Sequence, residues 1–275
     1  MASIDLFCTV GKKMEEYVSF LKQTCDLLAS KKHDIHYYCI GMDGCDEAPT
    51  GFNYIRSMRK DCHHDSLTHT TCMHETFDKI QSEYVIFVDV DIAILCKNWD
   101  DKIIQLLDRG YACTGFQYRH HFFPGIIMFA CKRHLVEDGL VDFRPKINKK
   151  HERIRYKIKS KKEADLFGKK VGGTVICDSS WKLPLLIKPK GYKAKTMGLI
   201  YGDSENSQLP FNSEIEKSVC LKAKNVRRMS EFHLNNEIFG THLKGARITS
   251  FDDELCLIWR ARIAKLFLEK YNIKI

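Results

Sequence analysis

The sequence contains no run of 18 or more apolar residues, which excludes a membrane-spanning helix of ordinary length. Its N-terminus lacks the basic segment followed by an apolar core that a secretory signal requires, so we expect neither a signal peptide nor a transmembrane anchor. Internal repeats and low-complexity segments are also lacking. The 275 residues are enough for a single globular domain with a full core.

The twelve cysteines do not follow the spacing of a disulfide framework. Five of them lie inside apolar runs, where a free cysteine behaves as a small buried side chain: Cys39, Cys96, Cys113, Cys131 and Cys177. A chain of this size does not need cross-links to fold. We therefore expect free thiols and a reducing, cytoplasmic compartment.

One stretch combines cysteine with histidine and raises the possibility of structural zinc, namely Cys62, His63, His64, His69, Cys72 and His74. Zinc sites of this kind usually show two matched ligand pairs at short spacing, and this stretch shows no such pairs. The spacing therefore favours roles on a helix face or at the edge of a bound nucleotide over a zinc site.

The net positive charge of the chain arises in one window. Residues 144–170 carry twelve Lys or Arg against three Asp or Glu, which equals the net charge of +9 of the whole chain. Sequence alternation at 154–159 predicts an exposed strand or a mobile loop there. The window could be a solvated loop, a nucleic-acid strip or a site for an anionic acceptor. Nucleic-acid binders usually interleave aromatic residues with the basic ones, and here only Tyr156 and Phe167 occur. The window is therefore interpreted as a flap that covers a donor diphosphate, or as a binding site for an anionic acceptor, in preference to a nucleic-acid strip.

The first part of the chain alternates between strand and helix patterns, in the order strand 3–10, helix 12–29, strand 34–42, short strand 53–55, helix 66–81 and strand 84–88. This alternation predicts an α/β fold, Rossmann-like, with a mostly parallel central sheet flanked by helices in a single domain. Ligands of such sheets bind at the carboxyl ends of the strands. In the later part of the sequence we expect a helix at 99–109, strands at 111–118, 122–131 and 238–245, and a loop at 202–213. A closing helix at 252–271 is expected to pack on the core. A helix on a membrane surface is the alternative for that last segment.

Two carboxylates interrupt the apolar run 84–95, at Asp89 and Asp91. Burying a carboxylate is unfavourable by several kcal/mol unless a cation or hydrogen bonds compensate it. Two of them one residue apart, at the end of a predicted strand, are typical ligands for Mn²⁺ or Mg²⁺ carrying a nucleotide diphosphate. Single Asp residues that cap a turn are common, but the pair and its position favour the metal site.

The chain here resembles the GT-A glycosyltransferases, whose DxD motif holds the metal of a nucleotide-sugar. The segment Ser66-Leu67-Thr68-His69, the predicted helix and the strand leading to Asp89-Val90-Asp91 are similar to that family's nucleotide-binding block. The resemblance covers most of residues 3–250 and is nearest to compact enzymes of large algal DNA viruses. It implies a hexosyl- or pentosyltransferase that uses a UDP-sugar in preference to a GDP-sugar, with a glycan or glycoprotein as acceptor. No nucleic-acid partner is expected.

The same resemblance implies which parts of the chain bind the nucleotide and which bind the acceptor. Residues of about 1–95 correspond to the nucleotide-binding half, about 96–250 to the acceptor side with the basic insertion 144–170, and 251–275 to a C-terminal helix. Thr9 and Val10 at the end of the first strand, with His69 and Val90, are expected against the nucleoside. In the segment Pro124-Gly125-Ile126-Ile127-Met128-Phe129 a small residue is expected to let the sugar approach.

His242-Leu243-Lys244-Gly245 is similar to the family's HxxG element, in which the histidine completes the metal shell. Imidazole suits Mn²⁺ better than Mg²⁺. Lys244, Gly245 and Arg247 are expected to meet the diphosphate. The family's version continues into Lys-Pro-Trp, whereas this chain continues Ala246-Arg247-Ile248. A structural histidine is the alternative interpretation of His242.

Asp178 follows a short apolar segment and is the candidate general base, if the enzyme inverts configuration. An Asp that caps the segment containing Trp181 is the alternative.

Two other functions compete with the transferase interpretation. Haloacid-dehalogenase-like phosphohydrolases also place a DxD after an apolar strand, but near the N-terminus and followed by other residues than Ile92-Ala93. A nucleic-acid or anionic-surface binding protein would act through residues 144–170.

Overall fold

The computed structural model describes residues 1–42, 45, 47–57, 65–150, 152–202, 204–222, 225, 228–245 and 250–275. Within them the strands are β1 Ser3–Val10, β2 Asp34–Gly41, β3 Asn53–Arg56, β4 Tyr84–Val88, β5 Ile92–Ile94, β6 Tyr111–Gln117, β7 Pro124–Lys132, β8 Arg155–Lys157, β9 Thr174–Ile176, β10 Lys193–Tyr201, β11 Met229–Leu234 and β12 Glu237–Leu243. The helices are α1 Glu15–Leu28, α2 Asp65–His74, η1 Phe77–Lys79, α3 Trp99–Asp108, α4 Arg133–Glu137, α5 Lys161–Phe167, α6 Leu183–Ile187, η2 Lys188–Lys190, α7 Glu214–Leu221 and α8 Glu254–Tyr271.

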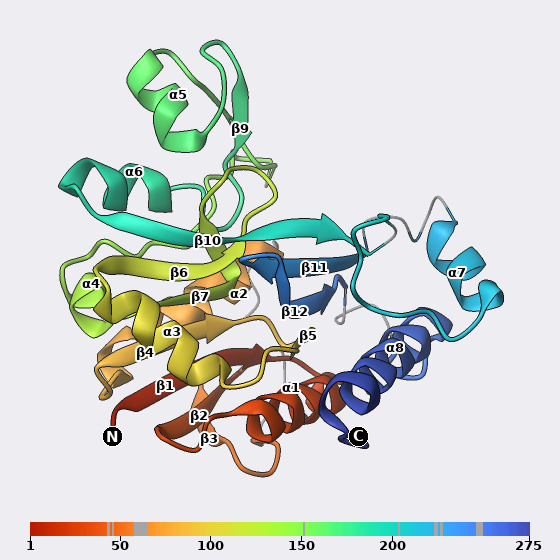
Figure 1. Cartoon of the computed structure of the whole chain (residues 1–275). Helices are drawn as coiled ribbons and strands as arrows, with labels where there is room; N and C mark the ends of the chain where they lie inside the picture. The colour runs from red at the N-terminus through yellow and green to blue at the C-terminus, as the bar shows by residue number, and fades with distance from the viewer. Residues whose placement is uncertain are drawn as a thin grey trace.

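Ten strands form one mixed sheet in the order β3-β2-β1-β4-β7-β6-β10-β11-β12-β5 (Figure 1). In the central part, from β3 to β10, the pairs β3-β2, β2-β1, β1-β4 and β6-β10 are parallel, and β4-β7 and β7-β6 are antiparallel. The strands from β10 to β5 pair antiparallel throughout. The predicted α/β architecture with a mostly parallel central sheet flanked by helices is confirmed.

Helices cover both faces of the central sheet, which explains why β4 reads as a continuous apolar run. Ile86 and Val88 belong to the core shared with α1, α3 and α8. Val85 and Phe87 belong to the opposite core, shared with α2, α4 and α6. Because successive side chains of a strand point to opposite faces, all five residues of β4 are buried.

The basic window forms a small structured unit beside the main sheet (Figure 1). The predicted exposed strand corresponds to β8, which pairs antiparallel with β9, whereas the helix α5 was not anticipated. Both aromatic residues of the window turn inward: Phe167 is fully buried, and Tyr156 packs 5.8 Å from the ring of Trp181. The window therefore surrounds a satellite core and leaves its lysines toward solvent.

The closing helix α8 packs on the core, as expected, with Leu255, Trp259, Ile263, Leu266 and Phe267 buried. The indole N–H of Trp259 donates to Thr241 Oγ1 at 3.1 Å and so links helix α8 to strand β12. Across the part of the chain that the structure describes, no helix has both the length and the apolarity that crossing a bilayer requires.

Strands β10 and β11 and helix α7 were not predicted. In β11 the buried residues Ser230 and Glu231 are polar, so hydrophobic periodicity carries no signal there. Strand β7 also differs from the prediction, because it begins at Pro124, two residues later than expected, and continues from there without an interruption.

Candidate metal and diphosphate site

The chain passes from the parallel half of the sheet to the antiparallel half at Asp89-Val90-Asp91. Strand β4 ends at Val88, and the Asp89 N–H donates to the carbonyl of Ile127 on β7 at 3.0 Å. The Asp91 carbonyl then accepts the N–H of Leu243 on β12 at 2.9 Å. The turn is thus pinned at both ends to neighbouring strands, at the carboxyl end of β4 where ligands of such sheets bind.

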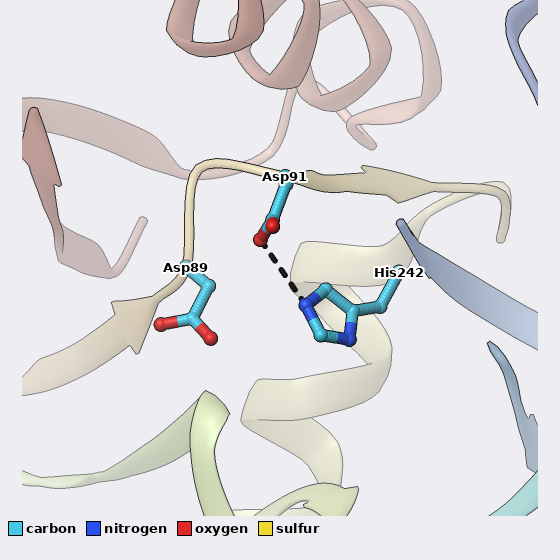
Figure 2. Close-up of side chains that lie close together, drawn as sticks. All are labelled: Asp89, Asp91 and His242. Carbon is cyan, nitrogen blue, oxygen red and sulfur yellow. Dashed lines mark ion pairs between the residues drawn. The ribbon is translucent and has the colours of Figure 1, made fainter. Parts of the chain in front are cut away.

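His242 is brought to this turn because β12 pairs with β5 in a register that places it opposite Ile92. Ligand atoms of Asp89, Asp91 and His242 all lie within 4.8 Å of one another (Figure 2). His242 Nε2 is 3.1 Å from Asp91 Oδ1, and the N–H of Gly245 donates to Asp91 Oδ2 at 3.0 Å. Among the described residues no other group of three or more His, Cys, Asp or Glu side chains converges in this way.

The electrostatics of the cluster favour a bound cation. Burial, and after it the nearby Asp91, raise the pKa of Asp89 although His69 acts against them. Two buried atoms, Asp89 Oδ1 and His69 Nε2, have no hydrogen-bond partner among the described residues, although they lie 3.4 Å apart. Two carboxylates and one imidazole form a donor set that suits Mn²⁺ and also accepts Mg²⁺. The residues present therefore fit a divalent metal ion.

We expect metal binding to weaken in acid because of His242. Burial acts to lower the pKa of His242, but the adjacent Asp91 and then Asp89 outweigh it, so the pKa is raised above its usual value. Below that pKa a proton occupies the nitrogen that the metal needs, so Mn²⁺ affinity should fall about tenfold for each pH unit and level off above it. Calorimetric Mn²⁺ titrations between pH 5.5 and 8.5 measure this slope.

The matched control for this dependence is His242→Gln, which should bind Mn²⁺ more weakly at high pH and with a flatter profile. An affinity in the parent protein that does not change between pH 6 and 8 would contradict the assignment of His242 as a ligand.

The cluster opens into a cavity of about 810 Å³. Nine of the residues predicted to form the site line it: Thr9, His69, Asp89, Val90, Asp91, Asp178, His242, Lys244 and Gly245. Val10 is fully buried in the core and is not part of the lining, because its side chain points into the sheet's packed face. Arg247 lies outside the described residues. The structure thus gathers in one cavity residues that are more than 230 positions apart.

Three cations of this cavity were missed by the sequence reasoning: Arg119, Arg153 and Arg228. They come from the β6–β7 connection, the basic window and the segment before β11. With Lys244 they bring four positive side chains to a cavity whose carboxylates are Asp89, Asp91 and Asp178. Only Arg153 carried a signal in the sequence, as a member of the basic window.

Asp178 lies in the cavity wall between two arginines. Its Oδ1 is 3.0 Å from Arg153 Nε, and its Oδ2 is 3.5 Å from Arg119 Nη2. Burial acts to raise the pKa of Asp178, but Arg153, the Ser179 N–H and Arg119 hold it below its usual range. Asp178 does not cap helix α6, which begins after Lys182 without a side-chain cap. It does begin the turn that contains Trp181, where its Oδ1 accepts the Ser179 N–H at 2.9 Å and its carbonyl accepts the Trp181 N–H at 3.3 Å, so the capping interpretation stands beside the catalytic one.

Gly125 has a different role from the one expected. A Cβ at this position would meet the Cβ of Tyr118 at 2.8 Å and its ring at 2.9 Å. The space above Gly125 is therefore filled by the Tyr118 side chain, which itself lines the cavity, and it is not open to a sugar. Gly125 shapes the site through Tyr118.

Gly125→Ala should consequently displace Tyr118 and deform this wall of the cavity. We expect the substitution to weaken binding of a sugar-bearing ligand about tenfold while Mn²⁺ binding persists, because the metal ligands lie on other strands. Parallel calorimetric titrations with Mn²⁺ and with the donor measure the two effects. Gly198→Ala is the control outside the cavity lining, since Gly198 has no positive φ and a Cβ there would meet only the carbonyl oxygen of His233, at 4.0 Å. Equal effects of the two substitutions on donor binding would contradict this role.

The cysteine- and histidine-rich stretch does not converge on one point where it is described. His69 faces Asp89, while His74 Nε2 accepts the N–H of Phe143 at 3.1 Å and Cys72 Sγ donates to Ser57 Oγ at 3.3 Å. Cys62, His63 and His64 lie outside the described residues.

No known protein-family model matches the sequence, and no curated protein does so either. Solved structures with some likeness include the mannosyltransferase PcManGT from Pyrobaculum calidifontis in complex with GDP-Man and Mn²⁺, at 10% identity and a TM-score of 0.38 over 51% of this chain and 47% of that chain. S. aureus TarS gives 13% identity and a TM-score of 0.36 over 51% of this chain and 30% of that chain.

A third is a variant of Drosophila β-1,4-galactosyltransferase 7 with manganese, UDP-Gal and xylobiose, at 10% identity and a TM-score of 0.40, covering 71% of this chain and 65% of that chain. The chain therefore spans less than two thirds of each of these proteins. They provide no support for the resemblance to viral enzymes, and the function proposed below rests on the cavity itself.

Proposed function

We propose that the protein is a metal-dependent glycosyltransferase of the GT-A type, which transfers a sugar from a nucleoside-diphosphate-sugar to a hydroxyl group of a glycan or glycoprotein. The observation that carries the proposal is the convergence of Asp89, Asp91 and His242 in a cavity that also holds Lys244 and Arg228. A divalent ion with adjacent cations matches a diphosphate in charge and in ligand preference.

In this proposal Asp89, Asp91 and His242 hold Mn²⁺ or Mg²⁺, which supplies Lewis-acid stabilisation of the departing diphosphate. Lys244 lies beside the metal ligands, since it directly precedes Gly245, whose N–H donates to Asp91. The backbone N–H of Lys244 donates to the carbonyl of Arg228 at 2.9 Å, so the two cations lie side by side where β11 begins and β12 ends. Both can neutralise charge as the diphosphate leaves.

The nucleoside is assigned to the ends of β1 and α2, where Thr9 and His69 line the cavity, within the half formed by residues of about 1–95. The acceptor is assigned to the half formed by about 96–250. We keep a UDP-sugar as the favoured donor. The described cysteines are buried free thiols, which supports a cytoplasmic location.

For an inverting reaction, the bond between the anomeric carbon and the diphosphate oxygen breaks while the acceptor oxygen bonds to that carbon from the opposite face. The acceptor proton then passes to Asp178, the one carboxylate among the described cavity residues that is not a metal ligand. Its low pKa makes it a weak base, so the proton transfer follows bond formation and does not precede it.

The proposal is tested by calorimetric titration of UDP and GDP with and without Mn²⁺, followed by a donor screen that detects released nucleoside diphosphate. We expect one nucleotide to bind only with the metal and one of its sugars to be hydrolysed slowly without acceptor. Metal-independent nucleotide binding would overturn the site.

The same preparation separates the two rivals. Metal-dependent hydrolysis of p-nitrophenyl phosphate without nucleotide binding would favour a phosphohydrolase. Salt-dependent DNA or RNA binding that disappears when lysines of window 144–170 are neutralised would favour an anionic-surface binding protein.

A further inference from the structure

A second charged cluster lies in the cavity wall, and the proposed reaction uses only its carboxylate, leaving its two arginines without a role. It is formed by Asp178, which is 5% exposed at its side chain, and by Arg119 and Arg153, at 39% and 36%. Arg153 also donates to Ser66 Oγ at 3.0 Å, and Arg119 Nε donates to His120 Nε2 at 3.0 Å. Both guanidinium groups are thus oriented by second partners besides Asp178.

One carboxylate compensates only one of the two guanidinium charges. The remaining positive charge also affects Lys244 in the same cavity. Burial, and after it the charges of Arg119 and Arg153, lower the pKa of Lys244. Each guanidinium has five N–H donors in a planar fork, and the contacts above use only part of them. The partly exposed donors therefore face the cavity with a net positive charge that an anionic group of a ligand would neutralise.

Tyr118 adds an independent observation. Its hydroxyl oxygen is buried close to Ser179 and Asp178 without a hydrogen bond of good geometry, and its ring lines the same cavity. The residue is 4% exposed and is held over Gly125, where a larger residue would displace it. A buried hydroxyl whose hydrogen bonds are poorly formed is unfavourable in the free protein and gains when a ligand oxygen accepts its proton.

We propose that Arg119, Arg153 and Tyr118, arranged around Asp178, form a subsite for a carboxylate or phosphate group carried by the substrate beyond the donor diphosphate. The inference rests on the proposed function, because it concerns the same cavity, and it restricts the substrate to an anionic class. A carboxylate or phosphate accepts two parallel N–H bonds from a guanidinium, which a neutral sugar hydroxyl cannot do. The anionic group belongs either to the transferred sugar, as in a uronic acid, or to the acceptor.

The experiment compares matched anionic and neutral probes on the protein, Arg119→Gln and Arg153→Gln, with Lys157→Gln as an exposed control from the same basic window. In the donor arm, UDP-glucuronate and UDP-glucose are titrated with Mn²⁺; GDP-mannuronate and GDP-mannose replace them if GDP is the nucleotide that binds. In the acceptor arm, glucose 6-phosphate and glucose are titrated both with and without nucleotide, so the subsite is judged even where no nucleotide binds.

We expect the anionic probe to bind about tenfold or more tightly than its neutral partner in one arm. That ratio should fall toward one in both arginine variants and persist in Lys157→Gln. A preference in the donor arm assigns the anion to the sugar, and a preference in the acceptor arm assigns it to the acceptor. Equal binding of anionic and neutral probes in both arms, or a ratio that survives both arginine substitutions, overturns the inference. Loss of all Mn²⁺-dependent nucleotide binding overturns the proposed function instead.

Discussion

Replacing Asp91 with asparagine is expected to abolish Mn²⁺-dependent nucleotide binding and to lower turnover by on the order of a thousandfold or more. Asp91 lies at the centre of the proposed metal site, since its Oδ1 is 3.1 Å from His242 Nε2 and its Oδ2 accepts the Gly245 N–H. An asparagine preserves the size of the side chain and an oxygen for Gly245, but it removes the negative charge that a hard cation requires. Calorimetry with Mn²⁺ and nucleotide, together with donor hydrolysis, measures both effects.

The control is Asp78→Asn, which changes an exposed carboxylate paired with the adjacent Lys79. It should leave nucleotide binding and turnover unchanged. In the parent protein, saturating Mn²⁺ should raise the melting temperature because a ligand that binds only the folded state stabilises it, and this increase should disappear in Asp91→Asn. Mn²⁺-dependent binding that persists in Asp91→Asn would remove this residue from the proposed metal site.

Arg262→Ala is expected to be the most destabilising single substitution considered, by about 3–5 kcal/mol in the free energy of unfolding. Arg262 is fully buried on α8, and its guanidinium donates to the carbonyl of Leu209 at 2.5 Å and to Ser207 Oγ at 3.1 Å. Ser207 in turn hydrogen-bonds to Glu231, which is also fully buried. Removal of the arginine takes away the permanent positive charge near this carboxylate, which keeps His233 at 3.1 Å and the Gln208 N–H at 2.8 Å, and it also leaves the carbonyl of Leu209 without its donor. Chemical denaturation followed by circular dichroism measures the loss.

Lys270→Ala is the control on the same helix, because Lys270 is exposed, and it should change stability by less than about 0.5 kcal/mol. The double variant Arg262→Met with Glu231→Gln removes both charges and should recover most of the stability, as expected for a coupled pair. A single Arg262→Ala variant as stable as Lys270→Ala would show that Glu231 is compensated by its other hydrogen bonds alone.

The sequence predicted the regular elements wherever burial follows a simple period. Strands β1, β2 and β4 and helices α1 and α8 were anticipated within a few residues, because each presents apolar side chains at strand or helix spacing to a core. Strand β11 could not be predicted, since its buried Glu231 depends on partners from other segments: the Ser207 hydroxyl, the Gln208 N–H and the charge of Arg262 on α8.

The residues of the candidate site likewise divide into those that the sequence indicated and those that only the fold brings together. Asp89 and Asp91 were identified because two carboxylates in an apolar run need a local explanation, and His242 because it belongs to a short motif near the end of the chain. Arg119 and Tyr118 carried no signal, since single arginines and tyrosines in polar connections are common in any globular protein. Their role depends on the fold, which brings the β6–β7 connection against Asp178.

The sequence by itself therefore determined the α/β architecture, the DxD turn at the end of β4 and the local excess of charge at 144–170. These features follow from periodicity, burial and charge within single segments. Only the tertiary structure decided that β12 delivers His242 to Asp91, that Tyr118 fills the space over Gly125, and that Arg119 and Arg153 meet around Asp178. Those contacts join residues from distant segments, and their pairing depends on strand register and loop packing, which no local pattern encodes.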